Sequence, residues 1–265
     1  MKEDKLNNAS LLPDLQNSDK ESYYISKVGI KDIKYPICLN DGDNGSYQTI
    51  GVFDICSDLK SKQRGTHMSR LVEILDKYHS QLSYSIIIQL LQEICDRLNC
   101  TSAFIKIAFP IFIAKKAPVS QLEAYVSYDC LIDATLNKGK FSINSEVNIP
   151  VKSLCPCSKA ISSYGAHNQR AMINIRMENY DNFAFSKIIK LAESSGSSEI
   201  YSLLKRVDEK FVTEKAYDNP MFVEDIVRDL IGKLSSISYL KILSVAVNSM
   251  ESIHNHNAFA FISNE

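Results

Sequence analysis

Apolar positions in the first half of the chain follow the periods typical of strands and helices in turn. An extended pattern from Ser22 to Leu39 and alternation from Tyr47 to Asp58 predict two strands. Apolar residues spaced three and four apart predict two helices, one near residues 71–78 and one from Tyr84 to Leu98. Apolar and β-branched residues then dominate Ser102–Ala114 and Gln121–Thr135, which we expect to be two further strands.

The second half shows nearly the same order. Strand patterns near Phe141–Val151 and over Met172–Met177 flank a polar segment with two cysteines. We then expect three helices and two final strands. Asn219-Pro220 is a start signal for the last of these helices. These elements are the helices Phe185–Glu193, Ser198–Arg206 and Phe222–Ser235 and the strands Ile237–Ser249 and Asn257–Ile262.

This repeated order predicts an α+β fold with antiparallel sheets, built from two similar modules. We expect a mobile N-terminal tail over residues 1–21, since that stretch is polar and without periodicity. The first module is expected over residues 22–140. The second is expected over residues 141–265, and it carries most of the candidate chemistry.

Composition narrows the class of protein. Apolar residues make up 45% of the 265 residues and the net charge is −1, so no overall field favours nucleic acid or an anionic membrane. The seven cysteines are odd in number, and the N-terminus lacks a secretory signal. We therefore expect reduced thiols and a cytoplasmic protein that binds neither nucleic acid nor a membrane.

Cys155-Pro156-Cys157 is the first candidate for chemistry. Structural zinc sites prefer two residues between their thiols and usually a second such pair, which is absent here. A catalytic metal site needs fewer protein ligands and leaves one position open for water. Two small buried thiols in a bend remain an equally good interpretation of the spacing alone.

Histidines and carboxylates supply further candidates. His254 and His256 share a face of an extended chain, whereas Glu251 and His254 share a face of a helix, and either arrangement can hold a metal. A polar turn is the competing interpretation, above all for His256. The carboxylate pairs Asp208-Glu209 and Glu224-Asp225 flank Asn219-Pro220. Glu224 and Asp225 lie at an expected helix start, where stabilisation of the helix dipole alone would explain them. These residues predict a mononuclear metal site and leave the reaction open.

Several motifs, in order, closely resemble those of the prokaryotic type IB GTP cyclohydrolases. The longest is Cys155-Pro156-Cys157-Ser158-Lys159, continued by Gly165-Ala166-His167-Asn168-Gln169-Arg170. The others are Lys27-Val28-Gly29-Ile30-Lys31, Gly65-Thr66-His67-Met68-Ser69-Arg70, Asp208-Glu209-Lys210 with Val212-Thr213-Glu214, and Asn219-Pro220 with Phe222-Val223-Glu224-Asp225. The resemblance covers about residue 22 to the C-terminus.

The resemblance implies a tunnelling fold (T-fold) of two modules and a homotetramer. It also implies that GTP and water give 7,8-dihydroneopterin triphosphate and formate, the first step towards tetrahydrofolate and, in some bacteria, a source for queuosine. The implied cofactor is a divalent metal, Zn²⁺ or Mn²⁺, with Fe²⁺ as a further candidate. Such an ion lowers the pKa of its bound water, which can then add to the guanine ring.

Matching motif positions implies roles for individual residues. The implied metal ligands are Cys155, Glu209 and His254, with Glu251 as a further candidate. Besides Cys155, the implied catalytic residues are His167, as a ligand or in proton transfer, and Cys157, whose role stays open. Glu224 is the implied purine anchor, because a carboxylate can accept two hydrogen bonds from guanine. The remaining substrate-binding candidates are His67 and three cations for the triphosphate, Arg70, Lys159 and Arg170.

Two alternatives belong to other functional classes. One is a different tunnelling-fold enzyme, such as the nitrile reductase of queuosine synthesis, although the Glu-Ser-Lys-Ser type of motif for nicotinamide binding is absent. The other is a metal-binding protein without catalytic activity, in which the cysteine, histidine and glutamate residues are structural.

Overall fold

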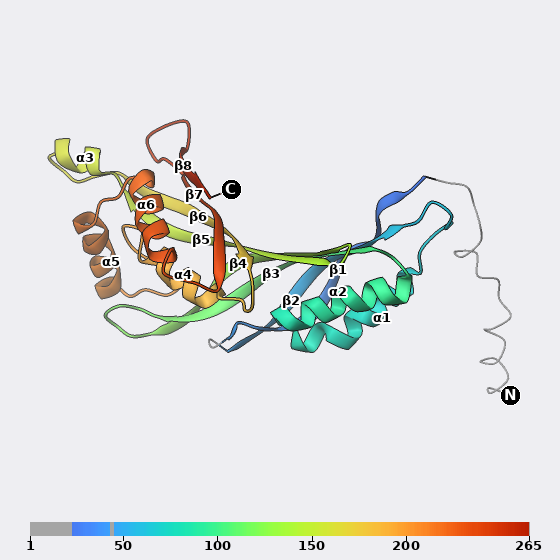
Figure 1. Cartoon of the computed structure of the whole chain (residues 1–265). Coiled ribbons are helices and arrows are strands. Elements are labelled where there is room, and N and C mark those ends of the chain that lie inside the picture. The colour runs from blue at the N-terminus through green and yellow to red at the C-terminus, as the bar shows by residue number, and fades with distance from the viewer. Residues whose placement is uncertain (1–22, 43–44, 265) are drawn as a thin grey trace.

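One antiparallel sheet runs through the whole molecule (Figure 1). The computed structural model describes residues 23–42 and 45–264, and the predicted tail over residues 1–21 lies outside them. Within the described residues the sheet has eight strands, whose spatial order is their order along the chain. Every neighbouring pair is antiparallel. The predicted class, α+β with antiparallel strands, is confirmed.

The first half supplies four strands and two main helices. Strands β1 and β2 form a long hairpin, and the helices α1 and α2 follow before the second hairpin of β3 and β4. The bounds are β1 Ile25–Asn40, β2 Ser46–Leu59, α1 Met68–Tyr78, the 3₁₀ turn η3 His79–Gln81, α2 Tyr84–Leu98, β3 Ser102–Lys116 and β4 Glu123–Asn137.

The second half has the same order with two additional helices, α3 and α5. Its bounds are β5 Lys140–Leu154, α3 Pro156–Ile161, β6 Asn168–Asn179, α4 Phe185–Glu193, α5 Arg206–Asp218, α6 Val223–Leu234, β7 Leu240–Ser249 and β8 Ala258–Ser263. Without α3 and α5, each half reads strand-strand-helix-helix-strand-strand. This repeated order of elements is the one that the sequence predicted. The boundary predicted between residues 140 and 141 falls at the start of β5.

The predicted helix over Ser198–Arg206 is wrong. Residues 198–205 are irregular, and α5 begins at Arg206. The backbone N–H of Lys152 in β5 donates to the carbonyl of Ser198 (2.9 Å), which holds this segment against the sheet. The Asp208 carboxylate accepts from the backbone N–H of Lys205 (2.9 Å) and thereby fixes the start of α5. Long-range pairing thus overrides the local helical pattern.

Alternation along the strands places the core on one face of the sheet. In β4, every second residue from Val126 to Leu136 is buried, and the residues between them are exposed or half-buried. The buried face packs against α1 and α2 in the first half and against α4 and α6 in the second. One continuous hydrophobic core joins both halves. None of the described helices has the length and apolar character needed to span a bilayer.

Candidate active site

The segment between β5 and β6, which contains α3, brings Cys155 next to His167. Pro156 occupies the first turn of α3, which favours an extended conformation for the residue before it. Cys155 is accordingly extended (φ −70°, ψ 118°), and its Sγ accepts from the backbone N–H of Ser158 at 3.4 Å. The backbone N–H of Cys155 donates to the carbonyl of His167 (3.1 Å). This hydrogen bond closes the loop at its base, so thiol and imidazole enter the same space.

That space is a cavity of about 340 Å³, called here the Cys155 pocket. Its walls come from the ends of β5 and β6, the start of α6, and the segment between β7 and β8. The lining side chains with chemistry include Cys155, His167, Gln169, Glu224, Glu251 and His254. Five of the predicted site residues therefore meet in one pocket, although they are up to 99 positions apart (254 minus 155).

Gln169 connects the polar groups of this pocket. Its Oε1 lies 3.0 Å from Nδ1 of His167, and its Nε2 donates to Oε1 of Glu251 (3.1 Å) and to Oγ of Ser249 (3.2 Å). Since an amide oxygen can only accept, Nδ1 of His167 carries the proton. The other ring nitrogen of a neutral His167 is then an acceptor or a metal ligand. Glu251 lies 3.8 Å from the same ring.

His254 and His256 both line the pocket, from the turn between β7 and β8. Their rings stack with centroids 5.1 Å apart, and His254 packs edge-on towards His167 at 6.4 Å. The segment is neither strand nor helix, so the two face-sharing arrangements considered for it do not occur. His256 nevertheless belongs to the pocket.

Glu224 approaches the same pocket from the first turn of α6. The helix start is fixed by the neighbouring Asp225, whose carboxylate accepts from the backbone N–H of Phe222 (3.1 Å). The two carboxylates therefore have different surroundings: Asp225 caps the helix, whereas Glu224 is exposed towards the cavity.

Cys157 and Lys159 lie on α3, outside the lining of the Cys155 pocket. Because a helix begins at Pro156, the two thiols do not share a face as they would in an extended chain, and Cys157 is exposed. Lys159 donates to the carbonyl of Tyr217, and its ammonium lies 4.3 Å from the centre of the Tyr217 ring. Its charge is thus held against α5.

Three other predicted residues lie elsewhere. Glu209 is exposed on the first turn of α5 and does not line the Cys155 pocket. His67 and Arg70 line a separate cavity of about 200 Å³, together with residues of α1 and α2. These two helices lie in the other half of the molecule (Figure 1). There, Arg70 donates to the backbone carbonyl of Arg97 (2.9 Å). A single chain does not bring these residues to the Cys155 pocket.

Arg170 lines a second cavity, which lies beside the Cys155 pocket. This cavity has a volume of about 320 Å³ and is called here the Lys152 pocket. Lys152 and Arg170 are directly opposite each other on β5 and β6. Gln169 lines both cavities, so the two pockets are adjacent.

The donor types in the Cys155 pocket suit a divalent metal. Thiolate, imidazole and carboxylate groups are ligands of Zn²⁺, and imidazole and carboxylate groups also bind Mn²⁺. Across residues 23–42 and 45–264, however, no three such side chains converge closely enough to hold an ion. The chemistry of the pocket therefore fits a metal, while its ligand set stays a prediction.

Sequence reasoning did not single out Gln169 and Lys152, which line the two pockets. Both lie within or beside the recognised motif, but an amide and a lysine in a strand carry no local mark of function. The register of β5 and β6 reveals them, because it pairs Ser153 with Gln169 and Lys152 with Arg170.

Fold and pocket together place a thiol, imidazoles and carboxylates around one cavity beside an antiparallel sheet, an arrangement typical of an enzyme. Residues 12–260 match the family described as Type I GTP cyclohydrolase folE2. The chain belongs to this family, whose members are GTP cyclohydrolase I enzymes of folate biosynthesis.

Curated proteins of this family are similar to the chain over almost its full length. GTP cyclohydrolase FolE2 of Fervidobacterium nodosum is 42% identical over 256 residues, covering 96% of this chain and 98% of the relative. The protein of the same name from Dictyoglomus thermophilum is 47% identical, covering 94% and 96%. Among solved structures, uricase from Arthrobacter globiformis shows a distant likeness, with a TM-score of 0.48 at 9% identity over 91% of this chain and 94% of that one.

Proposed function

We propose that the Cys155 pocket is where this enzyme binds GTP and hydrolyses it to 7,8-dihydroneopterin triphosphate and formate. The observation that carries this proposal is the meeting of Cys155, His167, Glu251 and Glu224 around one cavity. Cys155 and His167 supply groups for proton transfer, Glu251 supplies a negative charge beside His167, and Glu224 supplies a recognition group for the base.

Glu224 is proposed as the guanine anchor. Guanine offers N1–H and its exocyclic amine on one edge, and a carboxylate can accept from both. Adenine lacks this pair of donors. The exposed position of Glu224 at the start of α6 leaves its oxygens available to a ligand in the cavity.

His167 and Cys155 are proposed as the proton-transfer groups. Opening the guanine ring and releasing formate both require protons to move to and from nitrogen. With Nδ1 held by Gln169, a neutral His167 presents Nε2 as the acceptor, and the half-buried Cys155 thiol lies in the same cavity. Glu251, held by Gln169, stabilises the positive charge that His167 gains on accepting a proton.

A divalent metal, Zn²⁺ or Mn²⁺ with Fe²⁺ as a further candidate, is part of the proposal. When bound, such an ion supplies hydroxide near neutral pH by lowering the pKa of water. Cys155, His254 and Glu251 are the pocket residues that would hold it, and Glu209 would have to approach from outside the pocket.

The proposal extends to a homotetramer in the cytoplasm. The described sheet ends in two edges, β1 and β8, and exposed aromatic residues such as Phe259 (63%) and Phe261 (54%) lie on β8. Pairing between copies would cover these edges and could bring His67 and Arg70 of one copy to the Cys155 pocket of another. The seven cysteines are all free, which suits a reducing compartment.

Incubation of the pure, reduced protein with GTP tests the function. We expect a fluorescent pterin after oxidation of the products when Mn²⁺ or Zn²⁺ is present, and formate in equal amount. Absence of product with Mn²⁺, Zn²⁺ and, without oxygen, Fe²⁺ would overturn the proposal. Sedimentation equilibrium tests the tetramer, and a monomer at assay concentration would contradict it.

A further inference from the structure

Helix α2 ends in a turn that brings two cysteines together. Its C-cap, Asn99, has a left-handed backbone (φ 51°, ψ 43°), and its N–H donates to the carbonyl of Cys95. The N–H of Cys100 donates to the same carbonyl at 3.1 Å. A hydrogen bond that spans a left-handed residue in this way is the mark of the Schellman motif, in which the side chains at the two ends frequently contact each other. Here these two side chains are the thiols of Cys95 and Cys100.

The two sulfur atoms are in contact, and the surrounding backbone holds them there. The thiols of Cys95 and Cys100 are hydrogen-bonded to each other. Sγ of Cys100 also lies 3.9 Å from the carbonyl oxygen of Ile94, so this thiol points back over the last turn of α2. The next residue is anchored by Asp58, whose carboxylate accepts from the backbone N–H of Thr101 at 2.8 Å. Thiols at hydrogen-bond distance need only a small approach to reach the roughly 2.05 Å of a disulfide.

The two thiols differ in access and in acidity. Cys95 is 7% exposed, whereas Cys100 is half-buried, so a reagent from solvent reaches Cys100 first. The hydrogen bond between the thiols lowers the pKa of Cys100 and raises the pKa of Cys95. Burial and the negative charge of Asp58 oppose this effect at Cys100 without reversing it. Because the thiolate is the nucleophile, Cys100 is suited to attack first and Cys95 to follow.

We infer that Cys95 and Cys100 are a reversible modification site, which closes into a disulfide by exchange with a small disulfide such as glutathione disulfide. The Cys100 thiolate attacks one sulfur of the small disulfide, whose S–S bond breaks, and one small thiolate leaves. The Cys95 thiolate then attacks the sulfur of Cys100, and the second small thiolate leaves. The cysteines lose two electrons, the small disulfide gains them, and the two cysteine protons go to the two leaving thiolates.

The thiol pair lies directly behind the cavity that His67 and Arg70 line. Three of the residues between the two cysteines, Arg97, Leu98 and Asn99, line the same cavity. The backbone carbonyl of Arg97 also accepts the hydrogen bond from Arg70 at 2.9 Å. The disulfide would enclose this part of the cavity wall in one covalent ring and restrict its opening. Neither thiol lines the Cys155 pocket, so the inference does not depend on the proposed reaction.

Tryptic peptide mapping tests the pair, because trypsin cuts after Arg97, between the two cysteines. The folded protein is treated with glutathione disulfide, free thiols are blocked with iodoacetamide, and the peptides 78–97 and 98–106 are followed by mass spectrometry. We expect these two peptides to be joined about tenfold more often than the peptides of any other cysteine pair, since thiols in contact have a high effective concentration. Dithiothreitol should separate them.

Two variants and one condition control this measurement. Cys100→Ser should lose the linked peptides, and Cys38→Ser, which removes a half-buried cysteine on β1, should keep them. Cys100→Ala serves in place of Cys100→Ser if the latter does not fold. In urea the preference for this pair should disappear, because the turn is lost and Cys155 and Cys157 then compete at a closer spacing.

Hydrogen exchange of the peptide 98–106 tests the effect on the cavity wall. With the disulfide formed, and then reduced only after the exchange is quenched, the amides of this turn should exchange about tenfold more slowly. Cys100→Ser should show no change with glutathione disulfide. Three outcomes would overturn the inference: absence of the linked peptides in the folded protein, an equal preference for them in urea, or unchanged exchange in the linked protein.

Discussion

Oε1 of Gln169 lies 3.0 Å from Nδ1 of His167, and the same amide donates to Glu251 at 3.1 Å. One side chain thus sets the tautomer of an imidazole and the position of a carboxylate in the Cys155 pocket. An amide is suited to this task because it presents one acceptor and two donors in a single plane.

Replacing this amide should slow the reaction without unfolding the protein. We expect Gln169→Leu to lower kcat by about 10- to 100-fold, since loss of groups that orient catalytic side chains costs this much elsewhere. Steady-state kinetics with GTP measure the change. Histidine NMR should show His167 as a mixture of tautomers in this variant. Unaltered kcat together with an unaltered His167 spectrum would contradict the positioning role.

The two thiols of Cys155-Pro156-Cys157 should differ in importance. Cys155 lines the Cys155 pocket, and Cys157 is exposed on α3 outside it. Cys155→Ser is expected to abolish pterin formation, and Cys157→Ser is expected to keep most of it. The pair forms its own control, because both changes replace sulfur by oxygen within one turn of helix. Equal losses in both variants would show that Cys157 is catalytic, as the resemblance allowed.

Replacing either of two adjacent carboxylates on α6 should have a different effect: one change should weaken GTP binding, and the other should lower the stability of the fold. Glu224→Gln should reduce kcat/KM for GTP by about 100-fold, because one of the two acceptors for guanine becomes a donor. Its melting temperature should stay close to that of the unaltered protein. Asp225→Asn should do the reverse, lowering the melting temperature through the weakened cap while leaving KM for GTP unchanged. A normal KM in Glu224→Gln would remove Glu224 from guanine recognition.

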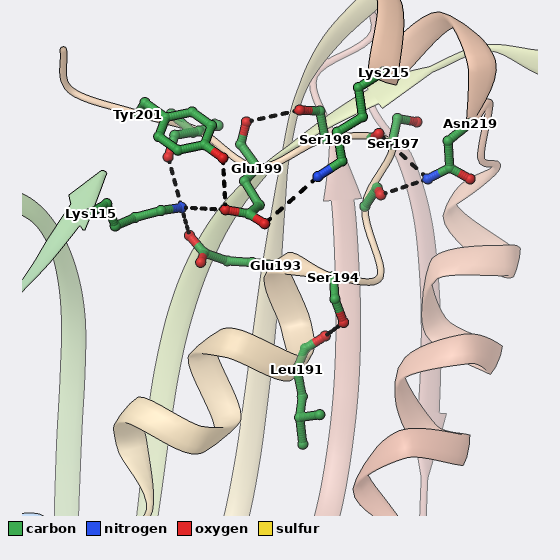
Figure 2. A network of polar contacts seen from close by, with 12 residues as sticks. Lys115, Leu191, Glu193, Ser194, Ser197, Ser198, Glu199, Tyr201, Lys215 and Asn219 are labelled. Atoms are coloured by element: carbon green, nitrogen blue, oxygen red, sulfur yellow. Dashed lines mark hydrogen bonds and ion pairs between the residues drawn. The ribbon is translucent and has the colours of Figure 1, made fainter. Parts of the chain in front are cut away.

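A buried ion pair beside the Lys152 pocket should be sensitive to the loss of one partner. Nζ of Lys115 lies 2.7 Å from Oε1 of Glu193, with 10% and 7% of the two side chains exposed (Figure 2). Lys115→Met should lower the free energy of unfolding by about 3–5 kcal/mol, because Glu193 stays buried without a cation. Urea unfolding measures this. The double variant Lys115→Met, Glu193→Gln should recover part of the loss, and no recovery would argue against the ion pair as the cause.

Acid should weaken the attachment of α5 to the sheet. Burial alone would raise the pKa of Asp208, but hydrogen bonds from Ser120, Lys205 and Val119 outweigh it and hold the pKa below the ordinary 3.8. A carboxyl with a depressed folded-state pKa stabilises the fold fully above its unfolded pKa and loses this effect as pH falls. The difference in unfolding free energy between the unaltered protein and Asp208→Asn should therefore shrink below about pH 5. A difference that stays constant down to about pH 3 would contradict this role.

Local periodicity predicts most of the fold here because most strands pair with their neighbours in sequence. Hairpins such as β3 and β4 need no information beyond alternation and a turn. The segment at Ser198 could not be predicted this way, since its conformation depends on Lys152, 46 positions earlier (198 minus 152). The same applies to Gln169 and Lys152, whose positions at the pockets depend on strand register. Motif resemblance singled out Cys155, His167, Glu224, Glu251 and His254, but it did not reveal that His67 and Arg70 line a cavity separate from the Cys155 pocket.

The sequential strand order also bears on the synthesis of the protein. Each strand of the first half finds its partners as soon as the next hairpin leaves the ribosome, so that half can form its sheet and core early. The Cys155 pocket is different, because its lining runs from Ser153 in β5 to Phe259 in β8. A nascent chain that lacks β8 therefore has most of the sheet and an unfinished pocket. The pocket can form only after β8 has been synthesised.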